Sequence, residues 1–402
     1  MILASNDLRL AFRCWAAIGA AACIVSVPLA AAQAPGREEG HAVASEQLRV
    51  SGAADTEPFG RIDCIAATPD GGVALFDGKG MDGPTLLLLD ENGKLRRRLG
   101  RKGAGPGEYS SLQLSDCISV TADGTIVLLD RGLSRIVRWD RNGKLLPAVS
   151  VPVRPSGLPP YLVPLRDGSF YVHSVIRPPT PGGVFDGGDY GYIHLSAAGS
   201  ILDTLRPSAM ALRKRGHRIG DPNVQWFPRI DGSVLEADQA ELGYRLRDLK
   251  GAWHPVSHPR PAIPFSTAEL AEEAAIQEWT RLLTRGAVPA GELAETKPAF
   301  ERIFSDAGMR VWLLRRVPAE AGIPRPEGGP PSIGATPRPA RHLFEPPVWV
   351  RFSAKGKYEG EVRFPLESAS GSAFVATGNT VWSASLSKEG EPVVIKWLIE
   401  MH

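Results

Sequence analysis

The chain has 402 residues and a formal net charge of +2, so its charge gives no global attraction to nucleic acid or to a membrane surface. Its composition, with 43% hydrophobic residues, 43 glycines and 35 prolines, favours a β protein rich in turns over a disordered chain. No nucleic-acid partner is expected.

The first 32 residues have the order of features of a secretory signal peptide. Arg9 and Arg13 precede an apolar stretch from Trp15 to Ala32, which ends in consecutive alanines. We therefore expect residues 1–32 to be removed, residues 33–45 to form a flexible mature N-terminus, and the protein to be periplasmic or secreted.

Two other interpretations of this segment remain open. It could be a retained membrane anchor, although small residues dominate it and Pro28 interrupts it. Cys23 follows a run of alanines and could carry a lipid, although the apolar stretch continues past it. After signal cleavage, no stable membrane span is expected.

A short pattern of apolar strands and glycine turns repeats along the rest of the chain. Its clearest copies, residues 63–77 and 116–130, align without a gap, and both run from Asp-Cys-Ile through an Asp-Gly turn to a final Asp. Short alternating strands joined by such turns predict β-hairpins. A repeat of this size cannot cover its own apolar face, so it must stack against other copies.

Weaker copies follow the same template, and they start near Tyr161, Asp231, Phe300 and Ala373. The last copy ends after its third strand, whereas Gln47–Val50 alternates without a partner of its own. We therefore predict an all-β fold over residues 46–402, a six-bladed β-propeller whose N-terminal strand closes the last blade. An open β-solenoid is the competing arrangement.

The stretch Gly100–Tyr109, with the sequence GRKGAGPGEY, is followed by a strand, the Asp123-Gly124 turn and Leu128-Leu129-Asp130. On these residues the chain resembles the six-bladed propellers of the NHL-repeat and TolB-like type found in exported bacterial proteins. The resemblance covers the first two blades well and the others only in pattern. It implies the fold, while such propellers serve as binding scaffolds, as partner surfaces and occasionally as enzymes.

Two cysteines remain after removal of the signal peptide. Cys64 and Cys117 hold equivalent positions in neighbouring repeats. In an oxidising compartment they could form a disulfide, which requires their α-carbons to approach within about 7 Å. Two buried free thiols are the alternative.

The long segments of the chain are expected on one face of the propeller. In a four-stranded antiparallel blade, the loops between the second and third strands and the links between blades share that face. The long segments all fall in these connections, and they are Ser174–Asp189, Leu205–Asn223, Pro255–Thr296 and Arg316–Pro346. Long loops gathered on one side of a rigid scaffold are the usual place for binding.

A helical insertion is predicted between blades 4 and 5, at about residues 265–296. Ser266 and Glu269 form a capping box, apolar residues from Leu270 to Leu283 recur at helical spacing, and Gly286 is placed to stop the helix. The helix could act as a lid over the propeller mouth or pack as a decoration on its rim.

Basic residues concentrate in two of the long connections. With Trp279 on the predicted helix, the candidate ligand-binding residues are Arg213, Lys214, Arg215, His217, Arg218 and Arg316. Because guanidinium groups make forked hydrogen bonds, the expected partner is a small anionic molecule, a saccharide or a protein. The alternative is a set of solvated charges that pair with the glutamates of the helical insertion.

No catalytic signature with adequate spacing is present, since the eight histidines are scattered and neither His-Glu-x-x-His nor Gly-x-Ser-x-Gly occurs. We therefore predict no catalytic residues, no metal and no cofactor, and an exported, non-catalytic propeller that binds a ligand or protein partner on its loop-decorated face. The alternative is a lactonase-like, metal-dependent hydrolase or lyase. It would hold calcium or another divalent ion at the propeller axis, where Asp63 and Asp116 occupy equivalent positions.

Overall fold

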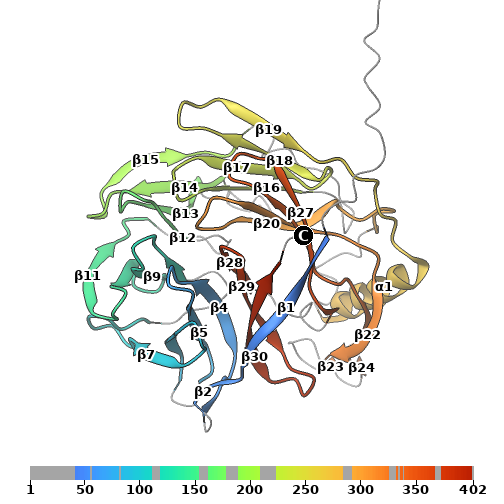
Figure 1. Ribbon diagram of the computed structural model, residues 1–402, viewed down its shortest axis with the longest axis horizontal. Coiled ribbons are helices and arrows are strands. Elements are labelled where there is room, and N and C mark those ends of the chain that lie inside the picture. Colours follow the sequence, from blue (N-terminus) through green and yellow to red (C-terminus); the bar gives the residue numbers. More distant parts are fainter. Residues whose placement is uncertain are drawn as a thin grey trace, which may run out of the picture. The chain divides into compact units, whose positions relative to one another are not determined.

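The computed structural model describes residues 41–54, 57–80, 83–110, 118–153, 162–177, 189–208, 223–283, 292–325, 332–333, 336–337, 339–366 and 373–400. The chain divides into two compact units, residues 1–38 and 39–402, and all the described residues lie in the second. They form strands and a single helix, α1 (Thr267–Leu283) (Figure 1). No helix of this described part is long and apolar enough to cross a membrane.

The strands form consecutive four-stranded antiparallel sheets. The first sheet contains β4 (Ile62–Ala67), β5 (Val73–Asp77), β6 (Thr85–Leu89) and β7 (Leu95–Leu99). The second contains β8 (Ile118–Val120), β9 (Ile126–Asp130), β10 (Arg135–Trp139) and β11 (Leu145–Ser150). The third contains β12 (Leu162–Pro164), β13 (Phe170–Arg177), β14 (Asp189–Leu195) and β15 (Ile201–Leu205).

The other sheets repeat this order. The fourth contains β16 (Val224–Pro228), β17 (Val234–Asp238), β18 (Gly243–Arg247) and β19 (Trp253–Ser257). The fifth contains β20 (Phe300–Ser305), β21 (Val311–Arg315), β26 (Val348–Phe352) and β27 (Tyr358–Arg363). The sixth contains β28 (Ala373–Thr377), β29 (Thr380–Leu386), β30 (Pro392–Ile399) and β1 (His41–Val50).

Short two-stranded ribbons decorate these sheets. They are formed by β2 (Gly52–Ala54) with β3 (Glu57–Pro58), by β22 (Glu320–Arg325) with β25 (Arg341–Phe344), and by β23 (Ser332–Ile333) with β24 (Thr336–Pro337).

Strand β1 bridges the last two sheets. Residues 44–50 pair antiparallel with β30, and residues 41–43 pair parallel with β27. The fifth and sixth sheets are thereby hydrogen-bonded into one eight-stranded sheet. The strand starts at His41, whereas a flexible segment was expected up to residue 45. Ala42 and Ala44 are both buried, but their small side chains give only a weak apolar signal in the sequence.

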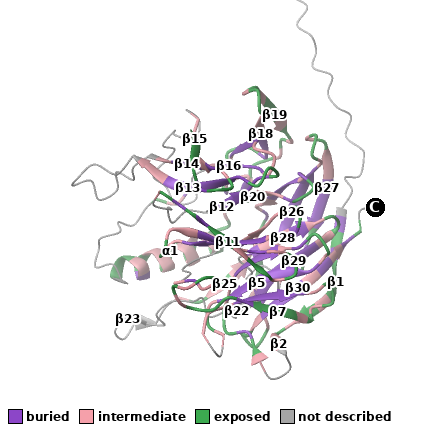
Figure 2. Ribbon diagram, turned by 90° about the vertical axis from the view of Figure 1, so that its left-hand side faces the viewer, coloured by how far each residue is buried: buried purple, intermediate pink, exposed green. Residues whose placement is uncertain are grey.

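Hydrophobic clusters join each sheet to the next. One cluster spans the first and second sheets, another the second and third, another the third to fifth, and another the fifth and sixth. A further cluster packs Trp382 of β29 with Leu75 of β5 and so joins the sixth sheet to the first. The sheets therefore follow one another round a common centre, with buried residues along their strands (Figure 1, Figure 2). This arrangement is that of a β-propeller, which confirms the all-β prediction.

The glycine-rich segment Gly100–Tyr109 forms the link between the first and second sheets. Tyr109 is buried, and its hydroxyl donates to the carbonyl of Pro84 and accepts from the N–H of Leu86, both over 3.2 Å. Burial raises the pKa of Tyr109 to about 12. The side chain therefore holds this link against the first sheet as a neutral hydrogen-bonding group.

The long connections join strands at the same end of the sheets. Those between β13 and β14 and between β21 and β26 lie within a sheet, whereas those between β15 and β16 and between β19 and β20 lead to the next sheet. Because adjacent strands are antiparallel, all of these connections start and end on one side of the sheets, which we call the long-connection face. The opposite side, where tight Gly turns such as Gly71 (φ +88°) and Gly124 (φ +85°) join the strands, is called the short-turn face.

Replacing Ala44 by Asp should destabilise the propeller. Ala44 belongs to the cluster shared by the fifth and sixth sheets, and an uncompensated charge in such a place costs about 3 kcal/mol or more. We expect a lower denaturant midpoint for Ala44→Asp, measured by tryptophan fluorescence. Ser45→Asp is the matched control, because Ser45 is the exposed neighbour on the same strand. Equal midpoints for the two variants would contradict the packing of β1 onto this cluster.

Candidate functional site

Helix α1 lies in the link between the fourth and fifth sheets and begins with a capping box. The N–H of Glu269 donates to Ser266 Oγ over 3.2 Å, and the N–H of Ser266 donates to the Glu269 carboxylate over 2.9 Å. These bonds confirm the predicted start of the helix. The helix runs to Leu283, and the predicted stop at Gly286 lies outside the described residues.

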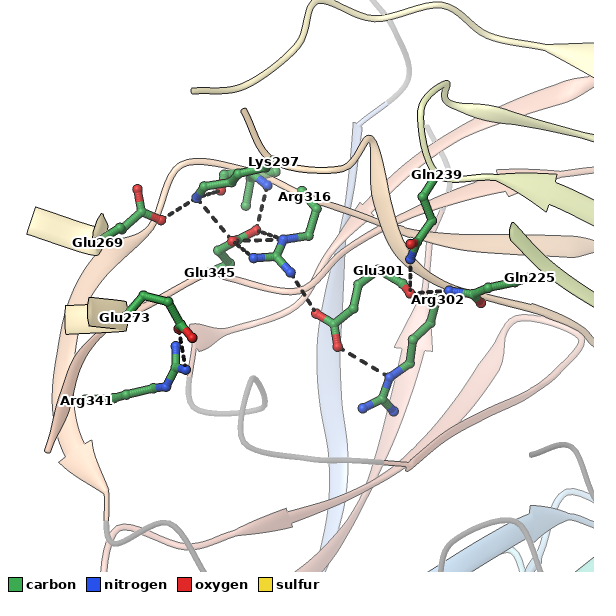
Figure 3. Close-up of polar contacts among 11 residues, drawn as sticks. Gln225, Gln239, Glu269, Glu273, Lys297, Glu301, Arg302, Arg316, Arg341 and Glu345 are labelled. Carbon is green, nitrogen blue, oxygen red and sulfur yellow. Dashed lines mark hydrogen bonds and ion pairs between the residues drawn. The ribbon is translucent and has the colours of Figure 1, made fainter. Parts of the chain in front are cut away.

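A buried lysine fixes the start of this helix to the fifth sheet. Lys297 Nζ donates to the Glu269 carboxylate and, over 2.8 Å, to the carbonyl of Val317. It also lies 3.1 Å from Glu345 (Figure 3). The centre of the Phe265 ring is 5.5 Å away. The side chain has no exposed surface. Because a buried ammonium group is tolerated only when it is paired, these contacts act as a clamp on the base of α1.

The same Glu345 carboxylate holds Arg316. Arg316 Nε donates to both oxygens of Glu345 over 2.9 Å, and Nη2 donates over 2.5 Å. Arg316 Nη1 lies 3.6 Å from Glu301, which in turn lies 3.4 Å from Nε of Arg302 (Figure 3). Charges of alternating sign therefore run from α1 to the first residues of β20. We call these residues together the charge chain, which comprises Glu269, Lys297, Glu345, Arg316, Glu301 and Arg302.

Two insertions of the long-connection face also bind each other. Arg341 of β25 donates to Glu273 of α1 over 2.9 Å (Figure 3). The backbone N–H groups of His342 and Leu343 donate to Glu272 over 3.0 and 3.3 Å. A glutamate of the helical insertion thus pairs with a basic residue of another long connection.

A small cavity of about 70 Å³ opens beside the charge chain. Its polar walls come from Glu301, Arg302, Arg315, Arg316 and Glu345, and apolar side chains of the fifth and sixth sheets complete it. Nη1 of Arg315 is held by Glu361, over 2.8 and 2.9 Å to the two carboxylate oxygens. The side chain of Arg302 is 46% exposed, so this guanidinium is the accessible end of the chain.

The structure places only part of the predicted ligand-binding set. The cluster of basic residues lies outside the described residues, and it comprises Arg213, Lys214, Arg215, His217 and Arg218. Trp279 lies on α1 and is buried, with 6% of its surface exposed. Arg316 lies in the charge chain, with its guanidinium held by Glu345.

The sequence did not single out Lys297 or Glu345. The only local signal was an abundance of charged residues in the long connections, which does not reveal the pairing. Their contacts depend on how α1 packs on the fifth sheet, which the sequence does not reveal.

Cys64 lies in β4, is buried and is disulfide-bonded. Its predicted partner, Cys117, lies outside the described residues, so the pairing itself stays a prediction.

The acids considered for an axial metal are only partly placed. Asp63 accepts hydrogen bonds from Arg61 over 2.5 and 2.8 Å, and Asp116 lies outside the described residues. Within the described stretches, no group of three or more His, Cys, Asp or Glu side chains is arranged to hold a metal ion.

Residues 58–173 match the model of the DUF5128 family, which is described as a 6-bladed β-propeller. This stretch covers the first two sheets and the start of the third, so the similarity to the family is local. It agrees with the blade number predicted from the repeats. No curated protein matches the sequence.

One solved structure with a comparable fold covers most of this chain, and others show weaker similarity. A member of the DUF4221 family from Bacteroides vulgatus shares 9% identity over 91% of this chain and 100% of its own, with a TM-score of 0.51. A virginiamycin B lyase from Staphylococcus aureus shares 13% identity over 87% of this chain and 98% of its own, with a TM-score of 0.37. A protein of unknown function from Bacteroides caccae shares 12% identity, over 77% and 83%, with a TM-score of 0.35. Similarity at this distance concerns the fold and not the activity.

The clamp on α1 depends on an ionised Glu269. Burial alone would raise the pKa of this carboxyl, but hydrogen bonds from Lys297 and Ser266 outweigh burial and hold the pKa below its ordinary value. A lowered carboxyl pKa contributes stability at pH values above the unfolded-state pKa, and this contribution is lost as the pH falls through the folded-state pKa. The clamp should therefore weaken in acid, below about pH 4.

Replacing Lys297 by Met should loosen α1. The substitution leaves the carboxylates of Glu269 and Glu345 without their shared cation, which costs about 3 kcal/mol. We expect faster amide hydrogen exchange in residues 267–283, measured by mass spectrometry. Arg281→Met is the control, because Arg281 pairs with Glu278 on the exposed side of the same helix.

The same measurement tests the pH dependence. After correction for intrinsic exchange rates, acidification from pH 7 to below about 4 should increase exchange in α1 of the wild type and change it much less in Lys297→Met. Equal exchange in Lys297→Met and wild type at neutral pH would contradict the clamp.

Proposed function

We propose that this protein is an exported, non-catalytic six-bladed β-propeller that binds a partner on its long-connection face. In this proposal β1 closes the ring, and α1 is a fixed wall of the binding surface held by Lys297. The observation that carries the proposal is the position of the long connections, which all leave the sheets on the same side. Function in rigid β scaffolds commonly resides in such loops.

The size of the cavity decides between a small ligand and a larger partner. Small-molecule sites usually have volumes of about 300–1,000 Å³, whereas the cavity beside the charge chain has about 70 Å³. It can admit one functional group but not a whole ligand. A larger molecule that lies across the face and inserts an anionic group is therefore favoured.

The charges around the cavity favour a carboxylate or sulfate as that group. Arg315 and Arg316 are each held by a short bidentate contact to a glutamate. Arg302 has a longer contact of 3.4 Å to Glu301 and is the more exposed side chain. Its exposed guanidinium can contact an incoming anion, since exposed ion pairs contribute little. We therefore infer an acidic protein segment or an anionic saccharide as the partner.

Export is supported by two features. The signal-peptide pattern of residues 1–32 predicts secretion. A disulfide-bonded Cys64 is typical of a protein that matures in an oxidising compartment such as the periplasm.

Reversing the charge of Arg302 should weaken binding of an anionic partner. We expect a fluorescein-labelled hexaglutamate peptide or a heparin-derived hexasaccharide to bind the purified protein, and Arg302→Glu to reduce that affinity about tenfold or more. Fluorescence anisotropy at fixed ionic strength measures the affinity of the probe for the wild type and for Arg302→Glu.

Lys355→Glu is the matched control for this experiment, because Lys355 is an exposed cation in a short turn of the same sheet, on the opposite face. The proposal fails if neither probe binds, or if the two charge reversals weaken binding equally.

Elemental analysis tests the non-catalytic part of the proposal. Protein purified without chelators should contain no stoichiometric divalent metal by plasma mass spectrometry. One equivalent of calcium or zinc that withstands dialysis would instead favour the metal-dependent hydrolase or lyase.

A further inference from the structure

We propose that a second site, on the short-turn face between the first and second sheets, binds a small organic anion with an apolar body. This site is distinct from the long-connection face and does not depend on the function proposed there. It rests on a cavity of suitable size and on a cation that has no counter-ion among the described residues.

The cavity has a volume of about 310 Å³. This value lies at the lower end of the range for small-molecule sites, about 300–1,000 Å³. Its walls are the turns that connect the first two strands of each sheet, with Thr68, Pro69 and Asp70 on one side and Ala122, Asp123 and Gly124 on the other. A compact ligand would therefore sit between two blades.

The floor of the cavity is apolar. Leu88 of β6 and Ile126 of β9 line it, and both belong to the cluster that joins the first and second sheets. The space stays open because Ala122 is small and Gly124 has no side chain. A Cβ at Gly124 would lie 3.0 Å from Cβ of Arg141 and 4.0 Å from Pro69. An apolar ligand body would thus extend the inter-blade core.

The rim carries Arg96 and Arg141, which differ in their pairing. Arg96 forms ion pairs with Asp70 and with Glu91, the latter over 3.1 Å. Arg141 forms no ion pair with any residue in the described part of the chain. The nearby Asp123 carboxylate is already bonded to Thr121 and Thr125.

The repeat explains this difference. Glu91 in the first sheet and Arg141 in the second hold the same turn position, just before Asn-Gly-Lys-Leu. The residue after that Leu is Arg96 in the first sheet, where it pairs with Glu91, but Leu146 in the second. The second sheet has therefore exchanged an internal ion pair for a cation at the rim of an apolar cavity. A guanidinium in this setting suits a carboxylate or sulfonate attached to a hydrocarbon or aromatic body.

The test uses 2-naphthoate as the anionic probe and 2-naphthamide as its neutral match. We expect the full-length mature protein to bind naphthoate at least about tenfold more tightly than naphthamide, by isothermal titration calorimetry. Arg141→Gln should remove that preference, and Ala122→Trp, which fills the cavity from an exposed turn, should abolish binding of both.

Lys388→Gln is the control, because Lys388 holds the position of Arg141 in the sixth sheet. Circular dichroism melting of each variant identifies any loss of fold, and a variant that melts like the wild type is used for the comparison. Ala122→Leu replaces Ala122→Trp if the larger side chain lowers the melting temperature.

Three results would overturn the proposal. They are no naphthoate binding up to millimolar concentration, equal affinity for naphthoate and naphthamide, and binding that Ala122→Trp and Arg141→Gln leave unchanged. Neither substitution touches the long-connection face. A negative result with naphthoate therefore leaves the function proposed for that face intact, and a negative result with the hexaglutamate or heparin probe leaves this site intact.

Discussion

The inner strands of these sheets are buried on both faces, and this constraint determines the rest of the architecture. Strands such as β5 and β9 are buried along their whole length, so neither face of their sheets can meet water without a large loss of hydrophobic free energy. Each sheet must be covered on both sides by another, and the sequence supplies copies of one unit to do so. The ring is closed by the cluster between β29 and β5. Only the edges and connections remain for binding.

The sequence predicted the sheets well because their signals are local. An Asp-Gly turn between two apolar runs specifies a hairpin within about ten residues, and the copies at 63–77 and 116–130 made the spacing plain. The capping box of Ser266 and Glu269 was predictable for the same reason. The start of β1 could not be predicted from the sequence, because its strand partners lie at the far end of the chain and its buried residues are alanines.

The candidate site was harder to predict, because residue type does not reveal ionic pairing. Arg316 was expected to meet a ligand, yet its guanidinium is held by Glu345. No sequence pattern indicated a role for Lys297, although this residue holds the helix in place. The two faces show opposite uses of charge. Among the described residues of the long-connection face, cations and carboxylates pair with one another and fix an insertion. On the short-turn face, the divergence between Glu91 and Arg141 leaves a cation beside an apolar space.

The parallel pairing of β1 with β27, next to its antiparallel pairing with β30, constrains how the molecule is made. The first described strand pairs with strands near the end of the chain, so these contacts have a large sequence separation and are expected to form late. Until then, β1 and the edges of β27 and β30 have unpaired backbone groups that can join another chain. A chain that is still being synthesised therefore exposes the backbone of β1 to strand pairing with another chain.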